Sequence, residues 1–266
     1  MSSKVIRHSE IIPMEIRKTI SLRYHTITRA INQEFWNSTS DTLHSFYVGS
    51  YGRGTAINTS DIDMLVELPQ KEFEKYDLQK GNGQSRLLQA VKNAIIVPYP
   101  RSEIKADGQV IVINFADGIK FEVVPAFKNT DWFGNVSYTY PDTNMGGNWK
   151  STDPKAEQEA MKEKDKNSNG LLIATCKHIR YIRDNNYSSY HLSGILIDTF
   201  VYDAIQGWHY LNEGEKSTNT GISYEQSLLN YYKSCFLPTL FAPGSNMRVD
   251  TSKGWEVLGK ILNHMV

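Results

Sequence analysis

The feature that most constrains this chain is the run Asp-Ile-Asp-Met-Leu-Val-Glu-Leu over 61–68, in which the acidic residues stand at every second or fourth position. In an extended strand, successive side chains point to opposite faces, so Asp61, Asp63, Leu65 and Glu67 would share one face. The other face is apolar from Ile62 onward and belongs against a hydrophobic core. The sequence therefore predicts a half-buried strand that carries two neighbouring carboxylates at its start.

Two adjacent carboxylates indicate a site for a cation. Like charges on Asp61 and Asp63 repel each other unless something neutralises them. Mg²⁺ does this well, because it binds a few carboxylates together with phosphate oxygens and water. Gly49 and Ser50 follow a predicted strand, where a glycine permits close approach of a ligand and the exposed amides and hydroxyl can hold phosphate. This combination indicates phosphoryl or nucleotidyl transfer.

The rest of the first half predicts a small mixed sheet backed by helices. Apolar residues recur at helical spacing in two segments, and Asp117–Gly118 is a strong hairpin signal between two further strands. The sheet should end near residue 130. The predicted helices are 9–36 and 84–97, and the predicted strands are 45–48, 61–68, 110–115 and 119–127.

The second half reads as helical. A stretch rich in Asp, Asn, Gly and Pro over 131–153 suggests a surface connection, and Pro154 is a good first helical residue. The fold class is therefore α+β, with residues 1–150 as a catalytic core and 151–266 as a helical domain that closes a cleft between them. Helices are expected over 171–184, 192–205, 224–236 and 255–265, with polar breaks at 214–221 and 242–250.

Composition excludes several classes of protein. Lys and Arg total 29 and so do Asp and Glu, so no net charge attracts nucleic acid. No apolar stretch approaches the ~20 residues that span a bilayer, and the amino terminus lacks a secretory signal. Two cysteines cannot form a disulfide framework, and the histidines show no zinc-site spacing. We expect a cytoplasmic protein with no membrane partner.

The motifs carry a resemblance to a known family. Gly49-Ser50, ten residues, then Asp61-x-Asp63 resembles the signature of the polymerase-β-like nucleotidyltransferases. Gly-Ser-Tyr-Gly-Arg-Gly-Thr followed by Ser-Asp-Ile-Asp is similar to the cyclic GMP–AMP synthase and oligoadenylate synthetase-like branch, whose bacterial members are cyclic-oligonucleotide synthases of antiphage defence. Phe-Glu-Val-Val-Pro-Ala-Phe over 121–127 resembles the context of the family's third carboxylate, with Glu122 where aspartate is usual.

The resemblance implies a set of site residues. Asp61, Asp63 and Glu122 would be catalytic and would hold two Mg²⁺ ions about 4 Å apart, which Mn²⁺ can replace. Gly49 and Ser50 would position a nucleoside triphosphate. The helix around Lys177 and the helix start at Ser193 resemble family segments that reach the same phosphates. The fold implied is the polymerase-β-like mixed sheet with an amino-terminal spine helix and a helical half.

The function implied is condensation of nucleoside triphosphates into a cyclic or short linear oligonucleotide messenger, with release of pyrophosphate. ATP and GTP are the expected substrates, and a pyrimidine is compatible. A protein activator and an effector that reads the product are compatible partners, whereas an obligatory nucleic-acid activator is not expected. Two alternatives remain open: nucleotidyl transfer to a protein, drug or tRNA end, and a binding module without turnover.

Overall fold

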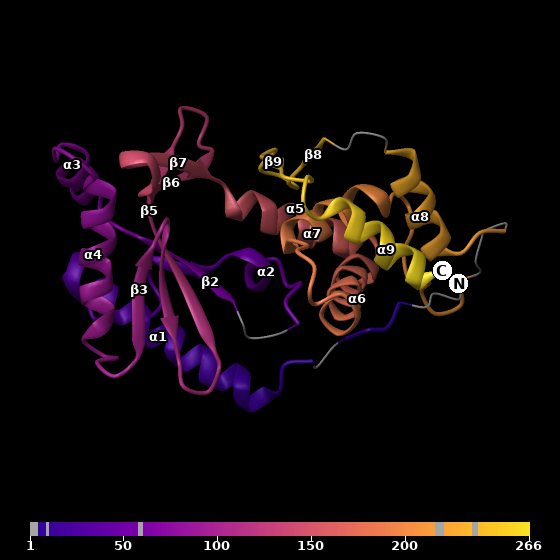
Figure 1. Ribbon diagram of the computed structural model, residues 1–266, viewed down its shortest axis with the longest axis horizontal. Helices are drawn as coiled ribbons and strands as arrows, with labels where there is room; N and C mark the ends of the chain where they lie inside the picture. The colour runs from indigo at the N-terminus through magenta and orange to yellow at the C-terminus, as the bar shows by residue number, and fades with distance from the viewer. Residues whose placement is uncertain (1–4, 9–10, 58–60, 216–220, 236–238) are drawn as a thin grey trace. The chain divides into compact units, whose positions relative to one another are not determined.

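The structure is a computed structural model that describes residues 5–8, 11–57, 61–215, 221–235 and 239–266 (Figure 1). Its internal contacts divide the chain into two compact units. The sheet unit comprises Ile12–Gly52 and Asn58–Asp153, as far as these are described. The helical unit comprises the described parts of Met1–Ile11, Arg53–Ile57 and Pro154–Val266. The predicted α+β class is confirmed.

The sheet unit is built on one mixed sheet with the strand order β1-β2-β5-β4-β3. Strands β2 and β5 run parallel, and β6 pairs antiparallel with both β5 and β7. Parallel strands need a crossover, and here the chain between them contributes two helices and the β3–β4 hairpin. The strands are β1 Ser45–Tyr47, β2 Ile62–Glu67, β3 Glu103–Asp107, β4 Val110–Asn114, β5 Lys120–Thr130, β6 Val136–Asp142 and β7 Asn148–Thr152.

Helices α1 and α4 lie side by side in the sheet unit, and α4 also packs on β3, β4 and β6. Asn82 caps α4, because its side chain accepts a hydrogen bond from the Ser85 amide at 2.9 Å. The predicted helix over 84–97 is confirmed. The helix predicted over 9–36 corresponds to α1, which begins later, at Met14, after Pro13 at the N-cap position. Positions 9 and 10 lie outside the described residues. The helices are α1 Met14–Phe35, α2 Gly49–Gly52, α3 Gln70–Asp77 and α4 Gly83–Ile96.

The predicted hairpin at Asp117–Gly118 is confirmed, with the Gly118 amide donating to the Phe115 carbonyl at 3.0 Å. The surface connection predicted over 131–153 is wrong, because most of it forms β6 and β7, which extend the sheet from the long strand β5. The Asp, Asn, Gly and Pro residues of this segment lie largely in the turns before β6 and between β6 and β7, and do not form one long loop. Tyr138 of β6 is fully buried, which explains why this segment folds against the sheet.

The helical unit packs its helices around one apolar core that includes Leu172, Leu196 and Leu258. The break predicted over 242–250 in fact contains β9, which pairs with β8. Positions 216–220 of the other predicted break, and position 236 of a predicted helix, lie outside the described residues. The elements are α5 Pro154–Asn167, α6 Leu171–Asn186, α7 Gly194–Ala204, α8 Tyr224–Ser234, β8 Leu240–Phe241, β9 Arg248–Val249 and α9 Trp255–Met265. No helix in the described part of the chain is long and apolar enough to cross a membrane.

Candidate active site

The turn at Gly49 and Ser50 packs directly against the carboxylate of Asp63 in β2. Gly49 begins the single-turn helix α2 with a positive φ of 57°, a conformation that disfavours side chains. A Cβ added at Gly49 would collide with the carboxylate of Asp63. The Val48 amide also donates to the Asp63 carbonyl at 2.9 Å. Glycine is thus required here both by the backbone and by the carboxylate that fills the adjacent space.

Three carboxylates meet near the amino-terminal ends of two neighbouring strands. The parallel register of β2 on β5 sets Asp63 directly beside Glu122, and Asp61 immediately precedes β2. Both Asp63 and Glu122 lie between fully buried neighbours in their strands, so they share the less buried face of the sheet. The structure therefore places the three residues that the sequence predicts as metal ligands at the starts of two neighbouring strands, and that they hold a metal ion stays a prediction.

The same face is covered further along β2. Leu65 is buried with Val48, Ala126 and Tyr138 in a small apolar cluster, so this face is covered beyond Asp63. Glu67 accepts a hydrogen bond from the Tyr138 hydroxyl at 2.9 Å and serves this packing. The polar part of the strand is confined to its start.

Lys120 is the residue of this site that the sequence reasoning missed. Its ammonium lies 2.6 Å from Asp61 Oδ1 and 2.7 Å from Glu122 Oε1, and so joins the two strands. Partial burial lowers the pKa of Lys120, but its hydrogen bonds to Asp61 and Glu122 outweigh this and raise the pKa above its ordinary value. Strand alternation was the available signal, because Lys120 and Glu122 are two residues apart on one face.

The donor set suits a hard cation. Within the described residues, no three His, Cys, Asp or Glu side chains are gathered closely enough to hold a metal ion. However, Asp61 and Glu122 already contact one cationic group, the Lys120 ammonium. Their donors are carboxylate oxygens, which Mg²⁺ and Mn²⁺ prefer. The chemistry of these donors therefore suits a divalent cation, and that Asp61, Asp63 and Glu122 hold one stays a prediction.

Two predicted phosphate contacts belong to the helical unit. Lys177 lies on α6, half-buried, and its charge lowers the pKa of His8 after the larger effect of burial. Ser193 occupies the N-cap position of α7, but its side chain makes no capping hydrogen bond. Gly49, Ser50, Asp61, Asp63 and Glu122 belong to the sheet unit. That all seven meet at one triphosphate stays a prediction.

The segment after the Gly-Ser turn is anchored in the helical unit by a buried charge network. Arg53 donates from Nε to Asp198 at 2.9 Å and from Nη1 to Glu157 at 3.0 Å. Arg180 donates to both oxygens of the fully buried Asp198, at 2.6 and 2.8 Å. Burial alone would raise the pKa of Asp198, but Arg180 and Arg53 hold it below its usual range. The sequence indicated Arg53 only as part of the Gly-Ser-Tyr-Gly-Arg-Gly-Thr motif, and its partners Asp198 and Glu157 were not predicted.

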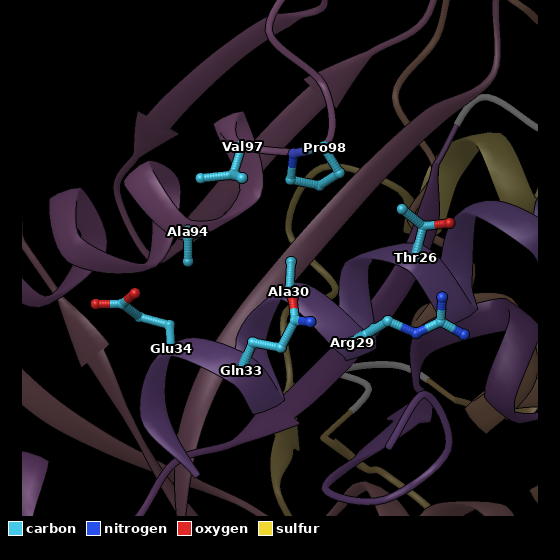
Figure 2. A pocket seen from close by; sticks show the side chains of 8 residues that line it. All are labelled: Thr26, Arg29, Ala30, Gln33, Glu34, Ala94, Val97 and Pro98. Atoms are coloured by element: carbon cyan, nitrogen blue, oxygen red, sulfur yellow. The ribbon is translucent and has the colours of Figure 1, made fainter. Parts of the chain in front are cut away.

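A separate surface pocket of about 350 Å³ lies between α1 and α4 (Figure 2). Its one arginine, Arg29, forms an ion pair with Asp41 at 2.8 Å. Further along α1, Lys18 pairs with Glu15 and Arg23 with Asp117. Each of these three cations therefore has a carboxylate partner nearby.

Comparison with known proteins adds three findings. The family described as Second Messenger Oligonucleotide or Dinucleotide Synthetase domain matches residues 7–165, more than half of the chain. A probable cyclic nucleotide synthase of Bacillus cereus strain VD146 is 28% identical over 195 residues, which cover 70% of this chain. The match spans only 57% of that relative's length.

Solved structures share the fold over almost the whole chain. The c-UMP-AMP synthase CdnE of Rhodothermus marinus, solved with Apcpp and Upnpp, has a TM-score of 0.64 at 14% identity and covers 96% of this chain and 90% of its own. The cyclic AMP-GMP synthase DncV of Vibrio cholerae has a TM-score of 0.58 at 14% identity, with 97% and 84% covered. The expected polymerase-β-like fold is confirmed.

Proposed function

We propose that this chain, which belongs to the family of Second Messenger Oligonucleotide or Dinucleotide Synthetase domains, condenses nucleoside triphosphates into a cyclic or short linear oligonucleotide. Each step would join a ribose hydroxyl oxygen to the α-phosphorus of a triphosphate. The hydroxyl would lose its proton to water, the bond from the α-phosphorus to the oxygen that bridges it to the β-phosphorus would break, and pyrophosphate would leave. The product would serve as a second messenger in antiviral defence.

One observation carries this proposal. Asp63 stands in register beside Glu122, and the Gly49 turn packs against the Asp63 carboxylate with no room for a side chain. A phosphate held at this turn would therefore lie next to the carboxylates that select a divalent cation. Positioning and charge neutralisation account for most of the catalysis of phosphoryl transfer, and this arrangement supports both.

The chain's own residues would have distinct tasks. The amides and hydroxyl at Gly49 and Ser50 would orient the triphosphate, and Lys177 and Ser193 would contact its outer phosphates. Asp61, Asp63 and Glu122 would hold Mg²⁺ or Mn²⁺. A divalent cation bound there supplies charge neutralisation on the phosphates and a lower pKa for the attacking hydroxyl. The buried Arg53 network would fix the chain just beyond the turn.

Two other activities use the same carboxylates. Nucleotidyl transfer to a protein, a drug or a tRNA end would differ in the acceptor, and a binding module would hold nucleotide without turnover. The second is disfavoured because a site without turnover has no need to keep three neighbouring carboxylates. The solved relatives with bound GTP or nonhydrolysable nucleotide analogues support nucleoside triphosphates as ligands here.

Product analysis separates these activities. Purified protein is incubated with each labelled nucleoside triphosphate, singly and in pairs, with Mg²⁺ or Mn²⁺, and small products are resolved before and after phosphatase treatment. Phosphatase-resistant dinucleotides or trinucleotides support messenger synthesis. Label found only on added protein or tRNA would instead support transfer to a macromolecule, and nucleotide binding without product would support the binding module.

The same assay tests the choice of activator. We propose that nucleotides and metal suffice for basal activity, with a protein as the class of partner that raises it. Basal product should then be unchanged by nuclease treatment of the preparation. Activity that appears only with added duplex DNA or RNA would contradict this part of the proposal.

A further inference from the structure

We infer that Lys120 is an internal counter-ion that competes with the divalent cation for Asp61 and Glu122. In the metal-free protein its ammonium contacts both carboxylates and offsets part of their charge, and a bound metal ion must displace it. The identity of the cation as the catalytic metal rests on the proposed function, but the competition itself does not. The lysine would thus set how much free metal is needed before the site fills.

The contacts of Lys120 are those expected of a cation in the site. Its Nζ lies 2.6 Å from Asp61 Oδ1 and 2.7 Å from Glu122 Oε1. One oxygen comes from the residue just before β2 and the other from β5, so the ammonium links the starts of the two strands, close to the point where Asp63 and Glu122 stand in register. The Lys120 side chain is 31% exposed and that of Glu122 28%, so this ion pair is partly out of water, whereas Asp61 is 56% exposed.

The ammonium and a divalent cation cannot share these oxygens at low cost. Mg²⁺ binds carboxylate oxygens at about 2.0–2.1 Å. A lysine that kept its contacts would therefore stand within about 5 Å of the metal ion, where the two positive charges repel strongly in this partly buried setting. Metal binding would be accompanied by movement of the Lys120 side chain, whose flexible stem allows it.

Lys120 also explains how the site exists without a metal ion. Three carboxylates on adjacent strand ends repel one another and would weaken the pairing of β2 with β5. One ammonium that contacts two of them offsets part of this repulsion. Loss of the lysine should therefore have opposite effects: the metal-free protein becomes less stable, and the site binds divalent cations more tightly.

The test measures Mn²⁺ binding by electron paramagnetic resonance, without nucleotide. Lys120→Met keeps most of the side-chain length and removes the charge, and Lys120→Arg keeps the charge. The matched control is Lys105→Met, which breaks the ion pair of Lys105 with Glu103 on the exposed edge strand β3. Lys120→Gln is the second neutral variant, and it takes the place of Lys120→Met if that protein does not fold.

We expect the neutral variants to bind Mn²⁺ about tenfold more tightly than the wild type, a change of about 1.4 kcal/mol. Lys120→Arg should not bind more tightly, and Lys105→Met should stay within twofold. The thermal midpoint in EDTA should fall for Lys120→Met and recover when Mn²⁺ is added. Adding Asp61→Asn to Lys120→Met should abolish the gain, which assigns it to this site.

Unchanged or weaker Mn²⁺ binding by both neutral variants would overturn the inference. The result is separable from the proposed function, because no nucleotide is present. A protein that makes no nucleotide product but gains Mn²⁺ affinity would refute the proposed function alone. A protein that makes product but shows no gain would refute the role of Lys120 alone.

Discussion

Replacing Asp198 with asparagine should remove a large part of the stability of the helical unit. Asp198 is fully buried on α7, and both of its oxygens accept hydrogen bonds from Arg180. Oδ2 also accepts from Arg53 Nε at 2.9 Å and from the Thr55 hydroxyl at 3.0 Å. With Glu157, the network balances two cations with two anions, so the asparagine variant leaves one positive charge without a counter-ion.

The size of the loss follows from this burial. Removing one partner of a buried ion pair costs about 3–5 kcal/mol, because the remaining charge stays out of water. That is a large share of the roughly 5–15 kcal/mol by which a domain is stable. At about 2–4 °C per kcal/mol, the thermal midpoint of the helical unit should fall by roughly 6–20 °C.

The assay is urea unfolding followed by circular dichroism, with hydrogen exchange to locate the change. The control is Asp184→Asn on α6, where a partly exposed carboxylate pairs with Arg183 at 2.7 Å. Such a pair contributes at most about 1 kcal/mol. Amides of α6 and α7 should exchange faster in Asp198→Asn and remain protected in Asp184→Asn. A loss below about 1 kcal/mol for Asp198→Asn would refute the view that this network anchors the segment after the Gly-Ser turn.

Three further outcomes are expected. Glu122→Gln should lose most product formation while Glu122→Asp retains part of it, and wild-type rates from the Gln variant would remove Glu122 from the site. Gly49→Ala should lower turnover at least tenfold, because the added Cβ meets Asp63 at a positive φ, and unchanged steady-state rates would contradict this. Burial and His8 lower the pKa of His178 to about 4, so stability should be lost as pH falls from about 6.5 toward 4. Urea unfolding at several pH values should show a shallower dependence for His178→Gln, and an unchanged slope would contradict the assignment.

The predicted parts of the sheet are those with a strong local pattern. Strands β2 and β5 are rich in apolar residues, which in part alternate with charged ones, and Asp-Gly is a preferred dipeptide in hairpin turns such as Asp117–Gly118. By contrast, β3 is a mostly exposed edge strand, and its charged residues gave no apolar run to detect. Strands β6 and β7 lie in a segment rich in turn residues, so the local sequence does not indicate strands there. They form because β6 pairs with the extended end of β5.

The site shows the same division between local and distant information. Alternation within β2 was enough to group Asp61 with Asp63, and the family motif supplied Glu122 as their neighbour. Lys120 needed only one further step of the same alternation. The Arg53 network had no such signal, because Glu157 and Asp198 lie 104 and 145 residues away in the chain. Contacts of that range become visible only once the helices are packed.

The most direct test of the central claim is the rate of pyrophosphate release from nucleoside triphosphates in Mg²⁺. The comparison is between the wild type, the Asp61→Asn/Asp63→Asn double variant and Glu103→Gln, a carboxylate control on β3. Metal-dependent release is expected from the wild type and from Glu103→Gln. The rate should fall at least about 100-fold, or about 2.7 kcal/mol in barrier, for a double variant that keeps its circular dichroism spectrum. A folded double variant that releases pyrophosphate at the wild-type rate would contradict the assignment of these carboxylates to catalysis.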